Sequence, residues 1–508
     1  MIQQARIAFS AWLVAASVGA AGPAHADVTV SGDVVPDDPS DPWDLGASAL
    51  VIGGASTPTA PTSGDVIVSR RGTLFSAGAS VAAEVGSGGT VQVIGYGSRW
   101  INNGRLAISL RRESRGSLLV QRGARVTTYE LLLGERGYLA EGYVLVEGYD
   151  ASLTCTTANI GHAEGVSRVE IKQGGSFSSN SAYVATCPVC QGHVTVTGSA
   201  TRWVNTGPFL LGANGRGTLL VDQGAKVFTT GARIETFSSA PLYGSSAATV
   251  RGWDATWTNE GLLRIGNVGY GELTVGAYGT LVTEDTEIRS ELGGAFVRVN
   301  EPYASWRNSG DVTIFASWST SPSLLIDGRG QVGVGGLLRT APLREGAEPG
   351  PGPIVRLARG ELGAGAIEVQ EGDFDFAGGR LSTGSFVGDL VNAQAGELSV
   401  GEAHPWTGVA GDYHQGPGAT LRVTVAGPDA APLLQVDGDV RLDGGLEVVA
   451  ADDAAPFQAG DTVALLGWDG ELTGTFAAID IALPLAPGLA WDTSALYTTG
   501  EITAVPEA

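Results

Sequence analysis

The sequence predicts an all-β protein built as a parallel β-helix, a β-solenoid whose successive coils stack along one axis. Two observations support this prediction. A segment of about 51 residues recurs along the chain, and within it apolar residues alternate in short stretches bounded by Gly, Asn and Asp. Alternation is typical of half-buried strands, and repeats of roughly 20 to 50 residues are typical of solenoids, propellers and related arrays.

Residues 1–26 have the features of a secretory signal peptide. A positively charged start precedes an apolar run over residues 7–22, and the triplet AHA at 24–26 is a small-x-small cleavage pattern before Asp27. The run is shorter than the roughly 20 residues that a membrane-spanning helix needs, and Pro23 ends it. We therefore expect an exported protein, extracellular or on the cell surface, or periplasmic if no translocator exists.

Composition limits the classes of partner. The chain has 508 residues, of which 43% are hydrophobic and only 16% are charged, so disorder is not expected. The formal net charge of −23 argues against nucleic acid or an anionic membrane surface, because both would repel the protein. No later stretch is long and apolar enough to span a bilayer, so direct membrane insertion is not expected.

After an N-terminal segment at 27–69, the repeats occupy residues 70–343. The first half of each unit carries Trp, one varied residue and Asn. The four copies of this pair are Trp100 and Asn102, Trp203 and Asn205, Trp257 and Asn259, and Trp306 and Asn308. A fifth copy has Leu153 and Cys155 in these positions, and the steps between successive copies are 53, 50, 54 and 49 residues.

The second half of each unit is a strand usually led by glycine, such as GSLLVQRGARV at 116–126 and GTLLVDQGAKV at 217–227. If each half is one coil of a parallel β-helix, a coil has about 25 residues. The rise per coil is then about 4.8 Å, the usual spacing between strands. A propeller with one four-stranded blade per unit is the alternative architecture.

The Trp-x-Asn pattern indicates core packing. In an extended chain residues i and i+2 share a face, so Trp and Asn point one way and the varied residue points the other. The asparagine can hydrogen-bond backbone or neighbouring side chains in a ladder. The glycine two residues later (Gly104, Gly207, Gly261 and Gly310) is expected to permit a positive φ at a bend. The functional alternative is an exposed aromatic stripe that stacks on carbohydrate.

Cys155, Cys187 and Cys190 are an odd number of cysteines for an exported protein. In an oxidising compartment we expect one disulfide, either within CPVC at 187–190 or from Cys155 to one of that pair. A metal site that uses these thiols with His162 or His193 is the alternative, but one C-x-x-C lacks the second ligand pair typical of zinc sites. No metal or cofactor is therefore expected.

Candidate catalytic groups are sparse. Glu371, Asp373 and Asp375 should share one face of a strand at 367–376, opposite Phe374 and Phe376. This arrangement is read either as a solvated face above a buried one or as an acidic cluster of a polysaccharide-active enzyme. A triad from His404, His414 and Asp412 has no serine or cysteine nucleophile motif beside it.

The ordered motifs G-x-x-S/T-x-W-x-N-x-G and G-T-L-x-V-x-x-G-A-x-V, over residues 70 to 315, resemble the passenger repeats of autotransporter-type bacterial surface proteins. The resemblance implies a right-handed parallel β-helix. Residues 356–508 resemble the segment that ends such helices as a C-terminal cap, and a Pro/Gly-rich loop at 344–355 precedes it. The family's outer-membrane barrel has no counterpart before residue 508, so a separate outer-membrane translocator is expected.

The predicted function is non-catalytic: adhesion, self-association or matrix interaction by a secreted or cell-surface β-helix. Its partners would be cell-surface glycans or further copies of the chain. Two alternatives remain open: a polysaccharide-active lyase or hydrolase, and a truncated autotransporter passenger. An enzyme predicts acidic groups that converge across neighbouring coils, whereas an adhesin predicts dispersed charges.

Overall fold

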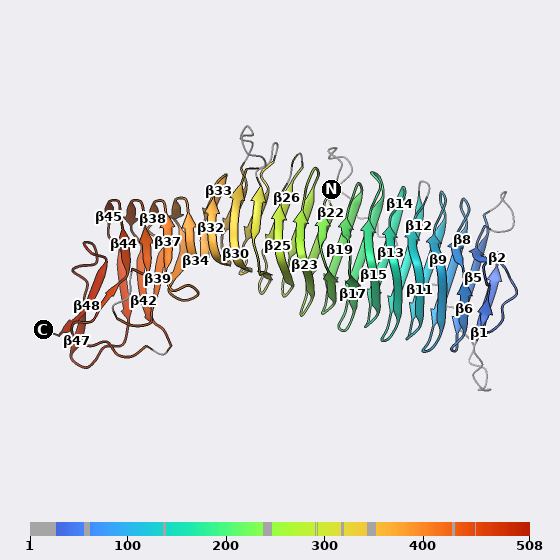
Figure 1. Cartoon of the computed structure of the whole chain (residues 1–508), viewed down its shortest axis with the longest axis horizontal. Helices are drawn as coiled ribbons and strands as arrows, with labels where there is room; N and C mark the ends of the chain where they lie inside the picture. Colours follow the sequence, from blue (N-terminus) through green and yellow to red (C-terminus); the bar gives the residue numbers. More distant parts are fainter. Residues whose placement is uncertain are drawn as a thin grey trace, which may run out of the picture.

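The computed structural model describes residues 27–54, 61–135, 139–236, 246–289, 291, 293–315, 320–342, 352–428, 432–452 and 454–507. The predicted signal peptide lies outside these residues. Within them the regular elements are all strands, and no helix is long and apolar enough to cross a membrane. The strands stack into one elongated solenoid that runs from the N-terminal to the C-terminal end of the chain (Figure 1). The prediction of an all-β solenoid of parallel coils is confirmed.

One side of the solenoid is a 14-stranded sheet in which each coil supplies one strand. The first strand pairs antiparallel with the second, and all later pairs are parallel. The strands of this sheet are, in spatial order, β1 (Asp27–Gly32), β5 (Ser63–Ser69), β8 (Gly88–Ile94), β10 (Arg115–Gln121), β12 (Ala140–Glu147), β14 (Gly165–Lys172), β16 (Gln191–Thr197), β19 (Arg216–Asp222), β22 (Ser246–Arg251), β24 (Gly271–Val275), β26 (Ala295–Val299), β29 (Ser323–Ile326), β31 (Ile354–Leu357) and β33 (Asp373–Phe376).

The rest of each coil crosses two further ladders, whose strand pairs are parallel apart from the first pair of the second ladder. The first, which we call the tryptophan ladder, contains β3 (Trp43–Asp44), β6 (Thr73–Ser76), β9 (Arg99–Ile108), β11 (Arg125–Leu133), β13 (Ser152–Ile160), β15 (Ser176–Val184), β17 (Arg202–Asn205), β20 (Lys226–Thr229), β23 (Thr256–Ile265), β25 (Thr280–Ile288), β27 (Ser305–Asn308), β30 (Gln331–Ala341), β32 (Glu361–Val369), β34 (Gly378–Val387), β36 (Ala395–Val400), β39 (Thr420–Val425), β42 (Gly445–Ala450) and β46 (Ala478–Ala482).

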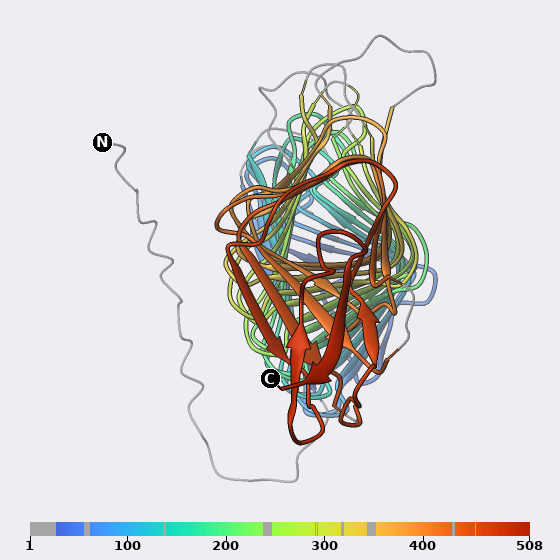
Figure 2. The same ribbon diagram turned by 90° about the vertical axis from the view of Figure 1, so that its left-hand side faces the viewer.

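The second ladder uses the C-terminal halves of the longer strands together with separate short strands. These are β2 (Val34–Val35), β4 (Ala49–Ile52), β7 (Gly78–Val81), β18 (Phe209–Leu211), β21 (Ala232–Ile234), β28 (Val312–Phe315), β37 (Thr407–Ala410), β40 (Leu434–Val436) and β44 (Leu466–Trp468). Seen nearly end on, the coils superimpose around a common interior (Figure 2).

Residue pairing between strands gives the length of a coil. Trp100 pairs with Val126, Val126 with Leu153, Leu153 with Phe177, and Phe177 with Trp203, which are steps of 26, 27, 24 and 26 residues. One repeat of about 51 residues therefore makes two coils, as predicted. In this column Trp203, Trp257 and Trp306 alternate with Val227 and Leu281, whereas Val126, Leu153 and Phe177 separate Trp100 from Trp203.

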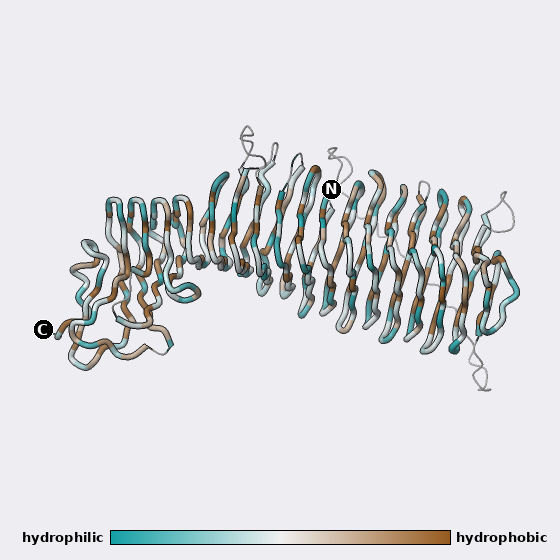
Figure 3. Tube along the Cα trace, viewed as in Figure 1, coloured by the Kyte–Doolittle hydropathy of each residue, from teal (hydrophilic) through white to brown (hydrophobic). Residues whose placement is uncertain are grey.

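The core follows from the alternation. In β10 and β12, Leu118, Val120, Val144 and Val146 are fully buried, while the residues between them face outward, with Leu145 still mostly buried. Apolar and polar residues accordingly alternate along the trace of each coil (Figure 3). Each buried aliphatic side chain contributes about 1.5–3 kcal/mol relative to exposure, and the stack repeats this contribution in every coil.

The coils on either side of the Pro/Gly-rich segment stack directly. Ser323 of β29 pairs with Ile354 of β31, and Gln331 of β30 pairs with Glu361 of β32. Residues 343–351 lie outside the described part of the chain.

The C-terminal coils use a shorter third sheet, which consists of β35 (Leu390–Asn392), β38 (Tyr413–Gln415), β41 (Val440–Leu442) and β45 (Leu472–Gly474). A three-stranded antiparallel sheet of β43 (Thr462–Ala464), β48 (Glu501–Pro506) and β47 (Leu489–Asp492) follows at that end of the solenoid (Figure 1). The backbone N–H groups of Leu465 and Leu466 donate to the Gly500 carbonyl at 2.9 and 3.2 Å. This contact covers part of the edge that the last coil would otherwise expose.

Candidate functional site

The repeated tryptophans lie in the core. Trp100, Trp203, Trp257 and Trp306 are at most 1% exposed. Each indole Nε1–H donates to a hydroxyl of the preceding coil. The acceptors are Ser76 for Trp100 (3.0 Å), Ser179 for Trp203 (3.1 Å), Thr229 for Trp257 (3.0 Å) and Thr283 for Trp306 (2.8 Å). The large side chain thus meets a polar partner without leaving the interior.

The asparagines complete the same buried network. The hydroxyl that accepts from the indole donates to the asparagine Oδ1, as between Ser179 and Asn205 (2.8 Å) and between Thr229 and Asn259 (2.8 Å). The amide Nδ2 of Asn102, Asn205 and Asn259 then donates to the carbonyl of the glycine two residues later. The Trp-x-Asn pair is therefore a structural unit that links neighbouring coils, and no exposed stripe is formed by these tryptophans.

The expected role of the following glycine is wrong at three of four positions. Only Gly261 has a positive φ, of 75°. At Gly104 and Gly207 a Cβ would instead lie 2.1 Å and 2.5 Å from a backbone carbonyl oxygen of the preceding coil. At Gly310 it would lie 2.2 Å from an Asp285 carboxylate oxygen. Close approach between coils, and not a left-handed backbone, requires glycine at these three bends.

The structure holds the three cysteines as free thiols, so the predicted disulfide is absent. Cys155 occupies the asparagine slot of the divergent repeat, where it is buried between Thr128 and Ser179 of the adjacent coils. Burial raises the pKa of its thiol to about 12. Cys187 and Cys190 lie in the turn between β15 and β16, where the Cys187 N–H donates to the Cys190 sulfur at 2.7 Å. The Cys155 side chain therefore lies in the tryptophan ladder, whereas Cys187 and Cys190 lie in a turn at a different part of the coil.

Metal ligands do not gather in the described part of the chain, where no group of three or more His, Cys, Asp or Glu side chains could hold an ion. His162 Nδ1 lies 3.0 Å from Thr186 Oγ1, and His193 Nδ1 lies 2.7 Å from Thr218 Oγ1. Each histidine thus contacts a threonine of the next coil.

The candidate acidic cluster lies on the outside of the solenoid. Asp373 is exposed at the start of β33, Asp375 forms an ion pair with Arg356 of the previous coil (3.4 Å), and Glu371 lies in the turn before the strand. Phe376 is buried, and Phe374 packs edge-on against Phe386 with ring centroids 5.2 Å apart. This is a polar strand face above an apolar one.

Asp412, the aspartate of the candidate triad, has a structural role at a corner of the solenoid. Asp412 Oδ1 accepts the Asp439 N–H at 2.8 Å, and the Asp412 N–H donates to Asp389 Oδ1 at 3.0 Å. Asp412 therefore joins the corners of three successive coils.

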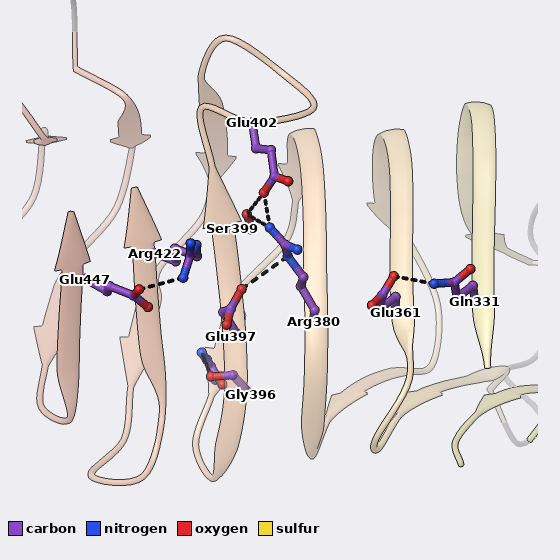
Figure 4. Close-up of polar contacts among 10 residues, drawn as sticks. Gln331, Glu361, Arg380, Gly396, Glu397, Ser399, Glu402, Arg422 and Glu447 are labelled. Atoms are coloured by element: carbon purple, nitrogen blue, oxygen red, sulfur yellow. Dashed lines mark hydrogen bonds and ion pairs between the residues drawn. The ribbon is translucent and has the colours of Figure 1, made fainter. Parts of the chain in front are cut away.

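Several charged side chains on the outer faces are paired between neighbouring coils (Figure 4). Arg422 contacts Glu447 at 2.6 Å, Arg380 contacts Glu397 at 3.1 Å and also Glu402, and Gln331 donates to Glu361 at 2.9 Å. Partly exposed pairs of this kind contribute about 0–1 kcal/mol each. They form rows along the axis and do not converge on one point.

A different set of aromatic residues forms an exposed row. Each coil turns sharply between the 14-stranded sheet and the tryptophan ladder, and several of these corners carry Tyr or Trp. We name this set the aromatic ridge; its members are Tyr96, Tyr149, Trp253, Tyr278 and Tyr303, with exposed fractions of 70%, 71%, 74%, 41% and 66%. A row of outward-facing rings along one corner is a surface suited to binding.

The rings of the aromatic ridge lean on the neighbouring coil. Trp253 and Tyr278 have ring centroids 5.3 Å apart, and Tyr278 stacks on Tyr303 at 4.9 Å with an interplanar angle of 22°. Tyr149 lies against Gly174 of the next coil, where an added Cβ would come within 3.0 Å of its ring. Tyr96 lies against Gly123 in the same way, at 3.4 Å.

Sequence reasoning missed these residues, although the signal was present. Tyr96, Tyr149 and Trp253 each follow the first glycine of a repeat segment (GYGSRW, GYDASL and GWDATW), and Tyr303 precedes the core tryptophan in EPYASW. The Trp-x-Asn pattern predicts only the buried positions, and the exposed aromatic residues lie outside it. In comparisons with known proteins, no family model, no characterised protein and no solved structure matches this chain.

Proposed function

We propose that this protein is an exported, cell-surface or extracellular β-solenoid that acts by binding, in adhesion, self-association or matrix interaction. The observation that carries the proposal is the aromatic ridge, which presents five aromatic side chains to solvent along one corner of the solenoid, three of them (Trp253, Tyr278 and Tyr303) on successive coils. Rigid aromatic side chains lose little conformational entropy on binding and supply large contact areas, so such a row favours attachment through many repeated contacts.

The distribution of charge supports binding over catalysis. Hydrolases and lyases of polysaccharides need acidic or basic groups that converge on one scissile bond. Asp375 and Arg380 are instead paired with side chains of adjacent coils, and Asp373 lies on an exposed strand. We also propose that the protein is related to autotransporter-type passengers, that its coils are right-handed and that a separate translocator exports it. The two-coil repeat with its Trp-x-Asn unit supports it.

Retention and cleavage should be measured in the same tubes. The purified protein is incubated with neutral and acidic polysaccharides, then assayed for new sugar ends and for protein retained on the solid phase. In parallel, cells that display the protein are scored for aggregation. We expect retention or aggregation without new sugar ends. New ends that disappear in the Asp373→Asn, Asp375→Asn variant would replace the proposal with a catalytic one.

A further inference from the structure

The corner that carries the aromatic ridge has a regular order of side chains. It lies between in-register ends of the 14-stranded sheet, such as Gln121 and Glu147, and in-register starts of the tryptophan ladder, such as Arg125 and Ser152. Along the axis, ten successive corners each carry an exposed residue: Tyr96, Arg122, Tyr149, Gln173, Ser199, Gln223, Trp253, Tyr278, Tyr303 and Arg329, of which the last three stand one position later in the corner than the others. From the N-terminal end, Tyr96 and Tyr149 therefore alternate with polar side chains. A run of three polar corners comes next, and then the three aromatic corners Trp253, Tyr278 and Tyr303.

We infer that the aromatic ridge binds a neutral polysaccharide chain laid along the solenoid axis. This inference rests on the proposed binding function and names the ligand class of its surface. A pyranose ring has apolar C–H faces and hydroxyl groups around its edge. The faces of the ridge rings that are not stacked on a neighbouring ring cover the first, because the negative face of an aromatic ring attracts C–H groups. Gln173, Ser199 and Gln223 reach hydroxyls, because amide and hydroxyl groups both donate and accept hydrogen bonds.

The spacing of the rings suits such a chain. Adjacent coils rise by about 4.8 Å, and the Tyr278 and Tyr303 centroids are 4.9 Å apart. An extended chain of pyranose rings advances by about one coil per sugar, so successive sugars meet successive corners. Tyr96 and Tyr149 lie over glycines, which leaves their outer faces open to a ligand.

Charge selects a neutral polysaccharide over other occupants. The protein carries a formal charge of −23, which repels both a second copy of the chain and an acidic polysaccharide. Around the stacked rings, Asp254 forms an ion pair with Lys226 at 2.7 Å, and Glu301 Oε2 accepts the Ala277 N–H at 2.9 Å. Both carboxylates can still accept hydrogen bonds from neutral sugar hydroxyls.

Tyr278 and Tyr303 have φ values of 59° and 63°, a left-handed conformation that is unfavourable for bulky side chains. The same conformation recurs at this corner in Arg122, Gln173, Ala200, Gln223 and Arg329, so it is a feature of the turn and not of the aromatic residues.

The repeats supply substitutions that the fold already accommodates. Ser199 occupies the position of Trp253 in another copy, so Trp253→Ser should keep the corner intact. Asn tolerates a positive φ, so Tyr278→Asn and Tyr303→Asn should relieve backbone strain while removing the rings. Tyr129 is 62% exposed at the bend between the two ladders, so Tyr129→Ser removes an equally exposed ring from a different corner and serves as the matched control.

The test measures retention by affinity electrophoresis in gels that contain a soluble neutral glucan, mannan or xylan, and by pull-down on insoluble cellulose and chitin. We expect the wild type and Tyr129→Ser to be retained on at least one of these polysaccharides. The triple variant Trp253→Ser, Tyr278→Asn, Tyr303→Asn should bind at least about tenfold more weakly, since losing one or two ring contacts alone accounts for about this factor. Far-UV circular dichroism verifies that each variant keeps its fold.

The outcomes separate this inference from the proposed function. Equal retention of the triple variant and the wild type would overturn the ridge as the binding surface while leaving the protein a glycan binder. Retention on acidic polysaccharides alone, or cell aggregation without retention on any neutral one, would overturn the ligand class while keeping an adhesive protein. No retention and no aggregation would overturn both.

Discussion

Replacing Asn102 with leucine should destabilise the coils around it far more than the same change at the next residue. Asn102 is 2% exposed, accepts a hydrogen bond from Ser76 Oγ (2.8 Å) and donates to Gly104 O (2.9 Å) and Thr128 Oγ1 (2.9 Å). Asn103 is exposed on the opposite face. Leucine keeps the branch point and the number of heavy side-chain atoms of asparagine but is larger, so the substitution removes the buried hydrogen bonds and adds some overpacking.

The magnitude follows from the three bonds. Each contributes about 1 kcal/mol net, and leaving a buried hydroxyl such as that of Ser76 without its acceptor costs about 1–3 kcal/mol. Apolar burial of the leucine offsets part of this loss. We expect the free energy of unfolding to fall by about 3 kcal/mol for Asn102→Leu, and by no more than about 0.5 kcal/mol for Asn103→Leu, as is usual for surface changes.

Urea unfolding followed by circular dichroism gives the global difference. Because each coil contacts mainly its neighbours, amide hydrogen exchange should locate the effect in β6, β9 and β11. If both variants unfold alike, or if exchange rises evenly along the solenoid, the buried polar ladder does not hold the coils together and the reasoning fails.

Three further results are expected. Gly207→Ala should lower the free energy of unfolding by about 1–3 kcal/mol through overpacking, because its Cβ would lie 2.5 Å from Asn180 O. Gly363→Ala is the control: its Cβ would have no atom within 4 Å, so the melting temperature should stay unchanged. Cys187 should be alkylated near neutral pH, because a hydrogen bond from Cys190 lowers the pKa of its thiol to about 7. Cys155 should not be alkylated, because burial raises the pKa of its thiol. Mass spectrometry of the native protein after alkylation measures both, and equal labelling of the two cysteines would refute this. Burial raises the pKa of Glu235, so its contribution to stability is present below its unfolded pKa and lost as pH rises through the folded value. Glu235→Gln should therefore stabilise the protein at pH 7 and flatten the fall in melting temperature between acid and neutral pH.

The class of fold and the size of its repeating unit follow from the amino-acid sequence alone. The step between Trp100, Trp203, Trp257 and Trp306, and the alternation within each half, were enough to predict stacked parallel coils of about 25 residues. Such a prediction succeeds because the core of a solenoid is made by contacts between equivalent residues of adjacent repeats. The repeat period therefore tells which residues meet.

The roles of individual positions, in contrast, depend on which residues of neighbouring coils they contact. The glycines after Asn102 and Asn205 are required by the preceding coil, which lies some 25 residues away in sequence, so no local rule for turns could identify the reason. The same holds for the free cysteines, whose columns differ, and for Asp412, whose partners belong to other coils. The aromatic ridge is the clearest case, because the residues in it alternate with Arg122, Gln173 and Ser199 along the chain and become one surface only when the corners stack.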